Sequence, residues 1–322
     1  MTEPARRHIA IVGCGAMGAL FGALLARVGH AVWTLDSRPE CVSAVAAHGI
    51  VVEGAGGSFR VAANATTDPA EVSAPDFIFI FVKAYDTAAA AEAAAAFAGP
   101  ETPVVTLQNG LGNVETLAAR FGTERVIGGT TAHGATEVAP GRVRHAGIGP
   151  TIIGESPGAR SARLEALAEV LRGAGIETET TADLDSAIWS KVVVNCGINA
   201  VGALTRLPNG ALADDPGAAQ VLRAAVEEAA AVAAAGGVTL AHDDPAAHTR
   251  EVCRATAENL NSMLQDVLRR RRTEVDAING AVARAGAAVG VATPVNAALA
   301  ALVGAVERTY DRHITGFSGG SE

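Results

Sequence analysis

Lys191, Asn195 and Asn199 are the residues of this 322-residue chain whose types and spacing are best suited to chemistry. They stand four residues apart in an otherwise apolar segment, so a helix would place them on nearly one face. An ammonium group among Trp, Val and Ile side chains must reach solvent or be used, because burial of an uncompensated charge is costly. The segment therefore indicates either a site or a lysine at a helix edge with two core asparagines bonded to nearby backbone.

A glycine-rich turn near the N-terminus predicts a dinucleotide-binding element. The apolar run His8–Val12 leads into this turn, and a helical pattern follows as far as Val28. Gly13 would permit the tight turn, Gly15 would let the backbone approach a pyrophosphate, and Gly18 would let the helix pack on the strand. The residues of this cofactor-binding motif are Gly13, Cys14, Gly15, Ala16, Met17 and Gly18. Within it, Cys14 is interpreted as a small residue fitted to the turn, because no partner base stands nearby in the sequence.

The end of the next expected strand, Ala31–Leu35, bears on the choice of nicotinamide cofactor. Asp36 stands where this fold places the residue that contacts the adenosine ribose. A carboxylate there accepts hydrogen bonds from the ribose hydroxyls of NAD and repels a 2′-phosphate, whereas Arg38, together with Ser37, could bind that phosphate. We therefore expect NAD(H) or NADP(H) as the cofactor, with a preference for NAD(H).

Composition excludes several other classes of protein. A formal net charge of −9 argues against nucleic acid or an anionic membrane as the main partner, so the Arg269–Arg272 run is interpreted as a solvated face. The four scattered cysteines form no CxxC pair and no zinc spacing, which favours free thiols in a reducing cytoplasm and no structural metal. The short stretch before the first strand leaves no room for a signal peptide, and the alanine-rich windows carry glutamates, so no membrane span is expected.

Strand and helix patterns alternate through the first half of the chain and predict an α/β fold with a Rossmann-type doubly wound sheet. Buried parallel strands are expected at Asp76–Val82 and Val104–Leu107. Lys83 and Asn109 follow these strands, at the sheet edge where ligands bind. Taken alone, each has a plainer interpretation, a charged strand end for Lys83 and a turn asparagine for Asn109.

The pattern changes to wholly helical after a strand near Ile176–Thr180. Before it, the Gly- and Thr-rich segment Thr130–Gly154 predicts antiparallel strands that extend the sheet. We therefore expect a dinucleotide-binding domain over residues 1–182 and an all-α domain over residues 183–322 that carries the substrate and the catalytic groups.

Several motifs in their order along the chain resemble the ketopantoate reductase (2-dehydropantoate 2-reductase) family. The motifs are the glycine turn, Lys83, Asn109-Gly110, Lys191 with Asn195 and Asn199, Pro208-Asn209-Gly210, Ser262-Met263-Leu264-Gln265-Asp266 and Thr273-Glu274-Val275-Asp276. The glycine turn is common to many families, whereas the lysine–asparagine helix combined with the two later motifs is far more specific. The resemblance covers nearly the whole chain and implies a helical domain of the 6-phosphogluconate dehydrogenase type.

The resemblance implies that the chain reduces a small 2-keto acid with a nicotinamide cofactor. Lys191 would donate a proton to the developing alkoxide, and Glu274 would orient the substrate and help to hold the lysine. Taken alone, Glu274 is more simply an ion-pair partner of the preceding arginines. The residues that match substrate-binding positions are Asn109, Asn195, Asn199, Asn209, Asn259 and Ser262, and Lys83 and Asn109 would lie near the nicotinamide. The family commonly uses NADPH and carries a basic residue at the position of Ser37, so the chain departs from that pattern here.

Geometry adds a constraint to this assignment. On one straight helix, Asn259 and Glu274 would lie about 22 Å apart, too far to share a small substrate. We therefore expect the backbone between Ser262 and Arg272 to be at least partly non-helical. A new helix is expected to begin at Thr273, with Asp276 completing an arrangement like a capping box.

Alternatives of two other kinds stay open at this stage. The first is an NAD-dependent 2-hydroxy acid dehydrogenase of the same superfamily that acts on a bulkier keto acid of the mandelate or branched-chain kind. The second is a non-catalytic nicotinamide-sensing protein, against which the presence of both Lys191 and Glu274 argues. We expect the active site between the two domains, and the alanine-rich helices could support a homodimer.

Overall fold

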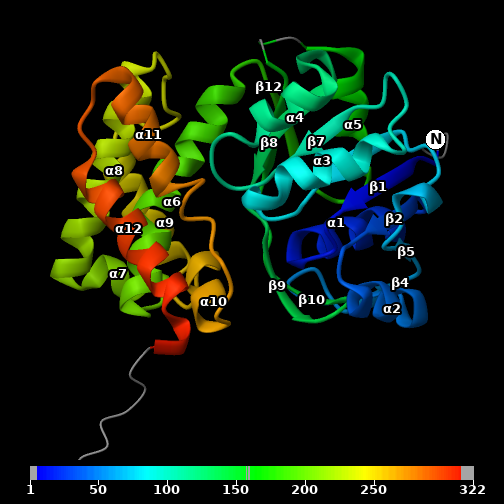
Figure 1. Ribbon diagram of the computed structural model, residues 1–322, viewed down its shortest axis with the longest axis horizontal. Helices are drawn as coiled ribbons and strands as arrows, with labels where there is room; N and C mark the ends of the chain where they lie inside the picture. The colour runs from blue at the N-terminus through cyan, green and yellow to red at the C-terminus, as the bar shows by residue number, and fades with distance from the viewer. Residues whose placement is uncertain (1–5, 157, 159, 313–322) are drawn as a thin grey trace, which may run out of the picture. The chain divides into compact units, whose positions relative to one another are not determined.

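The computed structural model describes residues 6–156, 158 and 160–312. The chain divides into two compact units, residues 1–188 and 189–322, and the division lies inside one long helix (Figure 1). The first unit contains the strands and the second unit is helical in its described part, so the predicted fold class is confirmed.

The main sheet of the first unit has eight strands in the order β12-β11-β8-β7-β6-β1-β2-β5. Their bounds are β1 His8–Val12, β2 Ala31–Leu35, β5 Asn64–Thr66, β6 Phe77–Ile80, β7 Val104–Thr106, β8 Val126–Thr131, β11 Thr151–Gly154 and β12 Thr178–Thr181. Neighbours are parallel except for β11 and β8, which pair antiparallel. Because β1 lies between β2 and β6, the chain leaves β1 at the point where the strand order reverses, which is where ligands bind to such sheets.

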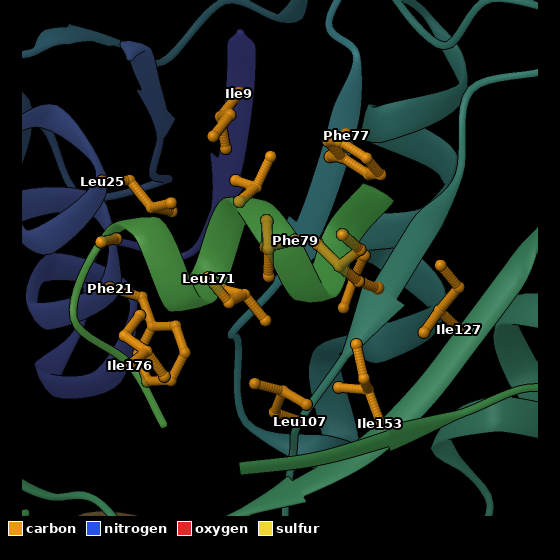
Figure 2. Close-up of a cluster of buried hydrophobic side chains, with 14 of the residues drawn as sticks. Ile9, Phe21, Leu25, Phe77, Phe79, Leu107, Ile127, Ile153, Leu171 and Ile176 are labelled. Atoms are coloured by element: carbon orange, nitrogen blue, oxygen red, sulfur yellow. The ribbon is translucent and has the colours of Figure 1, made fainter. Parts of the chain in front are cut away.

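Helices cover both faces of this sheet because its strands are apolar on both sides. On one face, α1 (Ala16–Arg27) and α5 (Ala162–Gly173) bury Ile9 and Ile11 of β1 together with Phe77 and Phe79 of β6. Figure 2 shows this cluster, with Leu171 of α5 among the side chains of the strands. On the other face, α3 (Thr87–Ala95) and α4 (Asn113–Phe121) cover the alternate strand residues. This two-sided burial explains the continuous apolar runs in the sequence.

A second sheet of four strands corrects one sequence prediction. Its order is β4-β3-β10-β9, with bounds β3 Ile50–Gly54, β4 Phe59–Val61, β9 Gly134–Ala139 and β10 Arg142–Gly147. The segment Thr130–Gly154 was expected to extend the main sheet. β8 and β11 do belong to that sheet, but β9 pairs with β10, and β10 pairs with β3. Ile50, Val52 and Val143 of the second sheet pack against apolar residues of α1 and α2 (Pro39–His48). This second apolar core gives the four strands a packing partner of their own.

The second unit is built around α6 (Leu184–Thr205), which continues from the first unit. The other helices are α7 Asn209–Asp214, α8 Pro216–Ala235, α9 Pro245–Ala255, α10 Ser262–Leu268, α11 Asn279–Val289 and α12 Pro294–Arg308, followed by the 3₁₀ turn η4 Tyr310–Arg312. By length and composition α6 is the one described helix that could cross a membrane, although 56% of its most apolar window is buried inside the protein. A core helix passes the same test, and this one carries Lys191 and two asparagines.

Candidate functional site

The turn between β1 and α1 contains two glycines that admit no side chain and one with open space around it. Gly13 has a φ of +95°, and a Cβ on it would lie 2.8 Å from the backbone nitrogen of Val82. A Cβ on Gly18 would lie 1.9 Å from the carbonyl oxygen of Gly13, so a side chain is excluded there by close packing of helix on strand. At Gly15, by contrast, φ is −76° and no protein atom lies within 4 Å of a Cβ. Neither backbone conformation nor protein packing therefore requires glycine at 15, but close approach of a ligand would.

Cys14 contributes to this turn through a backbone hydrogen bond rather than through its thiol. Its N–H donates to Oδ2 of Asp36 at 2.7 Å, and its thiol is buried. A hydrogen bond with the thiol of Cys41, together with burial, raises the pKa of Cys14 well above its ordinary value. The thiol is therefore a poor nucleophile. The remaining motif residues, Ala16 and Met17, open α1 and are half-buried.

Asp36, Ser37 and Arg38 follow β2, at the same edge of the sheet as the glycine turn. Asp36 is 7% exposed, and Arg38 contacts it through the backbone N–H and the guanidinium. Ser37 is exposed. The nearby Asp36, and then Glu137, raise the pKa of the Arg38 guanidinium above its ordinary value, so Arg38 is charged throughout the useful pH range. The structure thus brings together the residues that the sequence assigned to the adenosine end of the cofactor.

Lys83 and Asn109 also follow their strands as predicted, and Gln108 connects the two strand ends. Lys83 precedes a short 3₁₀ turn after β6 and is half-buried, as is Asn109 after β7. The side-chain amide of Gln108 donates to the carbonyl of Val82 at 2.7 Å and to the hydroxyl of Thr87 at 2.9 Å. Gln108 was not predicted as a site residue, although it directly precedes Asn109 in the sequence.

In the second unit, α6 places Lys191, Asn195 and Asn199 on one helical face, as their spacing predicted. Lys191 and Asn195 are half-buried, and Asn199 is 5% exposed. Burial lowers the pKa of Lys191 to about 8, and the negative charge of Glu274 opposes that shift. Glu274, itself 8% exposed, is therefore close enough to Lys191 to act on its charge.

The break that geometry required between Asn259 and Glu274 is present, but the second half of the prediction is wrong. α10 ends at Leu268, and irregular backbone and a turn follow until α11 begins at Asn279, six residues beyond the expected start at Thr273. The Thr273 hydroxyl is used elsewhere, since it contacts the Glu307 carboxylate and accepts from the N–H of Val275 at 3.1 Å. No capping bond from Thr273 to Asp276 appears among the described contacts, and Asp276 is exposed.

Asn279 attaches the turn that contains Glu274 to helix α6. This fully buried residue donates from Nδ2 to the carbonyl of Cys196 at 3.0 Å and to Oδ1 of Asn296 at 2.9 Å. Cys196 lies on α6 between Asn195 and Asn199 in sequence, so this hydrogen bond connects the helix that carries Lys191 with the segment that follows Glu274. This role could not be predicted from the sequence, where Asn279 is marked only by the glycine that follows it.

The other expected substrate-binding residues lie at the start of α7 and α10. Asn209 is 7% exposed, and its backbone N–H donates to the carbonyl of Asn259 at 3.0 Å, which brings these two residues together. The side-chain amide of Asn209 donates to the Thr256 hydroxyl, while its buried Oδ1 has no protein partner. Asn259 and Ser262 are exposed. An orphaned buried acceptor is costly, so the Asn209 Oδ1 is suited to accept from a ligand hydroxyl.

Family comparison covers both units. The family model described as "Ketopantoate reductase PanE/ApbA" matches residues 9–158, and the model described as "Ketopantoate reductase PanE/ApbA C terminal" matches residues 183–307. The chain belongs to the ketopantoate reductase family. It is accordingly an oxidoreductase, and the resemblance noted from its motifs is confirmed.

Relatives and solved structures agree with this assignment over almost the full length. The chain is 40% identical over 302 residues to the 2-dehydropantoate 2-reductase of Halobacterium salinarum, covering 94% of this chain and 99% of that protein. The ketopantoate reductase structure from Ralstonia eutropha JMP134 has a TM-score of 0.87 at 35% identity, covering 95% and 100% of the two chains. A D-mandelate dehydrogenase structure with NADH and anilino(oxo)acetate has a TM-score of 0.89 at 28% identity, covering 94% and 99%.

Proposed function

We propose that this enzyme reduces ketopantoate, a 2-keto acid, to the corresponding 2-hydroxy acid, with Lys191 as the general acid. The observation that carries the proposal is the Lys191 site, in which a half-buried lysine shares a helical face with two asparagines and has a pKa lowered to about 8. A lysine with an ordinary pKa gives up its proton reluctantly at neutral pH, whereas one near 8 is still mostly charged and can donate.

A reduced nicotinamide, when bound, supplies the hydride that adds to the keto carbon. As the carbonyl oxygen gains negative charge, the Lys191 ammonium stabilises that oxygen and transfers a proton to it, which leaves a neutral amine that solvent reprotonates. Glu274 holds the ammonium in its charged form before transfer, since its carboxylate raises the pKa of Lys191 against the effect of burial. In this proposal Lys191 donates the proton, and Glu274 keeps Lys191 protonated until the transfer.

Substrate binding falls to neutral groups in this proposal. The amides of Asn195, Asn199 and Asn209 and the hydroxyl of Ser262 can bind a carboxylate or a hydroxyl without forming an ion pair that would compete with Lys191. The buried, unpartnered Oδ1 of Asn209 supports a substrate that offers a hydroxyl donor, and ketopantoate has one. Asn109 and Asn259 remain proposed members of this set, and Lys83 a proposed contact of the nicotinamide.

The cofactor is a nicotinamide dinucleotide in this proposal, held by the turn from Gly13 to Gly18. The open space at Gly15 supports that assignment, because it is the one glycine of the three that neither conformation nor packing explains. Asp36 favours NAD(H) over NADP(H), against the habit of the family. Four buried free cysteines fit a reducing cytoplasm, where we place the reaction.

The second candidate, a dehydrogenase for a bulkier keto acid, is favoured by the likeness to D-mandelate dehydrogenase. An assay of reduced nicotinamide oxidation with ketopantoate, benzoylformate and 2-ketoisovalerate separates the candidates. We expect kcat/KM to be highest for ketopantoate. A higher value for benzoylformate or 2-ketoisovalerate would establish the second candidate, and no oxidation with any of the three would overturn the proposed reductase activity.

A further inference from the structure

The carboxylate of Asp36 is already saturated by protein donors. Its Oδ2 accepts from the Cys14 N–H at 2.7 Å and from Nη2 of Arg38 at 3.2 Å. Its Oδ1 accepts from the backbone N–H of Arg38 at 2.9 Å and from Nε of the same residue at 3.0 Å. A carboxylate offers about four acceptor positions. A ribose hydroxyl can therefore bind Asp36 only where Arg38 yields one of its bonds.

Arg38 is shared between Asp36 and a second carboxylate from a distant part of the chain. Its Nη1 donates to Oε1 of Glu137 at 2.7 Å, across a separation of 99 residues. Glu137 lies on β9 of the second sheet and its side chain is only 13% exposed, while that of Arg38 is 32% exposed. Because both groups are largely shielded from water, their attraction exceeds that of an ordinary surface pair.

This arrangement treats the two nicotinamide cofactors differently. When a ribose hydroxyl takes one acceptor position of Asp36, Arg38 stays in place through its bond to Glu137. A 2′-phosphate must instead draw the guanidinium away from both carboxylates and then lie close to them. Asp36 and Glu137 against Arg38 give these three side chains a formal charge of −1, which also repels a phosphate dianion.

We propose that Glu137 is a specificity-determining residue that makes the enzyme prefer NADH to NADPH, by holding Arg38 against Asp36. The inference rests on the proposed use of a nicotinamide dinucleotide and goes beyond it by placing the selection on a residue of the second sheet. Asp36 supplies the contact to the ribose, and Glu137 prevents Arg38 from becoming a phosphate-binding residue.

The test is the dissociation constant of NADH and of NADPH, measured by fluorescence titration of the full chain without keto acid. Glu137→Gln keeps the size and shape of the side chain and removes its charge. We expect the unaltered protein to bind NADH more tightly, and this variant to shift the ratio toward NADPH by roughly tenfold, with less shift at high salt. Glu53→Gln is the matched control, because Glu53 lies on the same sheet and pairs with Arg142 and Arg144 instead; its ratio should not change.

The double variant Glu137→Gln/Arg38→Gln tests whether a change in cofactor preference comes from the released Arg38 guanidinium or from a general effect on folding. The gain in NADPH affinity should disappear in it, because that gain needs a released guanidinium. Tighter binding of NADPH than NADH by the unaltered protein would overturn the inference, and so would an unchanged ratio in Glu137→Gln. Failure of the unaltered protein to bind either nucleotide would instead overturn the proposed function together with this inference.

Discussion

Lys191 illustrates how one side chain acquires a chemical role from its surroundings. The segment around it is apolar, so burial lowers its pKa to about 8, and the negative charge of Glu274 opposes that shift. The two effects leave the ammonium charged at neutral pH and ready to lose its proton. Sequence spacing was enough to predict the shared face with the asparagines, but not the pKa, which depends on a carboxylate 83 residues further along the chain.

The pH dependence of the reduction follows from this pKa. Since the protonated lysine is the active form of a general acid, kcat/KM should fall as the pH rises above about 8. Glu274 raises the pKa of Lys191, so Glu274→Gln should move the alkaline limb to lower pH as well as reduce the rate. Profiles of both proteins between about pH 6 and 10 measure this. A limb near 10, or one that the substitution leaves in place, would contradict the account of Lys191.

Glu137 shows what a single sequence does not reveal about a residue. Nothing in its local pattern distinguishes it from any polar residue on an exposed strand. Its contact with Arg38 exists only because β9 belongs to the second sheet. Since Thr130–Gly154 was expected to extend the main sheet, the Glu137–Arg38 ion pair could not be predicted from the sequence. Asp36 and Arg38, by contrast, could be predicted, because the glycine turn fixes how far along the chain the end of β2 must lie.

At the scale of elements, the predicted strands β1, β2, β6 and β7 agree with the structure because their largely apolar runs are short and bounded by glycine, proline or polar residues. The start of α11 could not be predicted. Thr273 has the form of a capping residue, but the Glu307 carboxylate, supplied by α12, competes for its hydroxyl. Local capping patterns therefore mislead where a distant helix provides a stronger acceptor.

The β1–α1 turn provides a test at this scale, because its glycines serve different purposes. Gly15→Ala should fold normally and weaken nucleotide binding by roughly tenfold or more, since the added methyl fills space reserved for the pyrophosphate. Gly18→Ala should instead destabilise the fold by about 2 kcal/mol or more, because its Cβ meets the Gly13 carbonyl. Thermal unfolding and NADH titration of both variants measure the two effects. Unimpaired NADH binding by Gly15→Ala would count against a pyrophosphate at this turn.

For the whole molecule, the proposed chemistry draws on both units. The first unit contains the glycine turn and the Asp36–Arg38–Glu137 group, and the second contains Lys191 and Glu274. Nucleotide binding and proton donation should therefore be separable by mutation, because different units carry them. This separation lets the catalytic role of Lys191 be tested without disturbing the cofactor.

The most direct measurement compares turnover in Lys191→Ala and Lys191→Arg with NADH binding by the same proteins. Arginine keeps the positive charge but does not give up its proton, so it distinguishes proton donation from charge stabilisation alone. We predict that Lys191→Ala loses on the order of 10²–10⁴-fold in kcat with ketopantoate, that Lys191→Arg is also severely impaired, and that both bind NADH as the unaltered enzyme does. Near-normal kcat in Lys191→Ala would contradict the assignment of Lys191 as the proton donor.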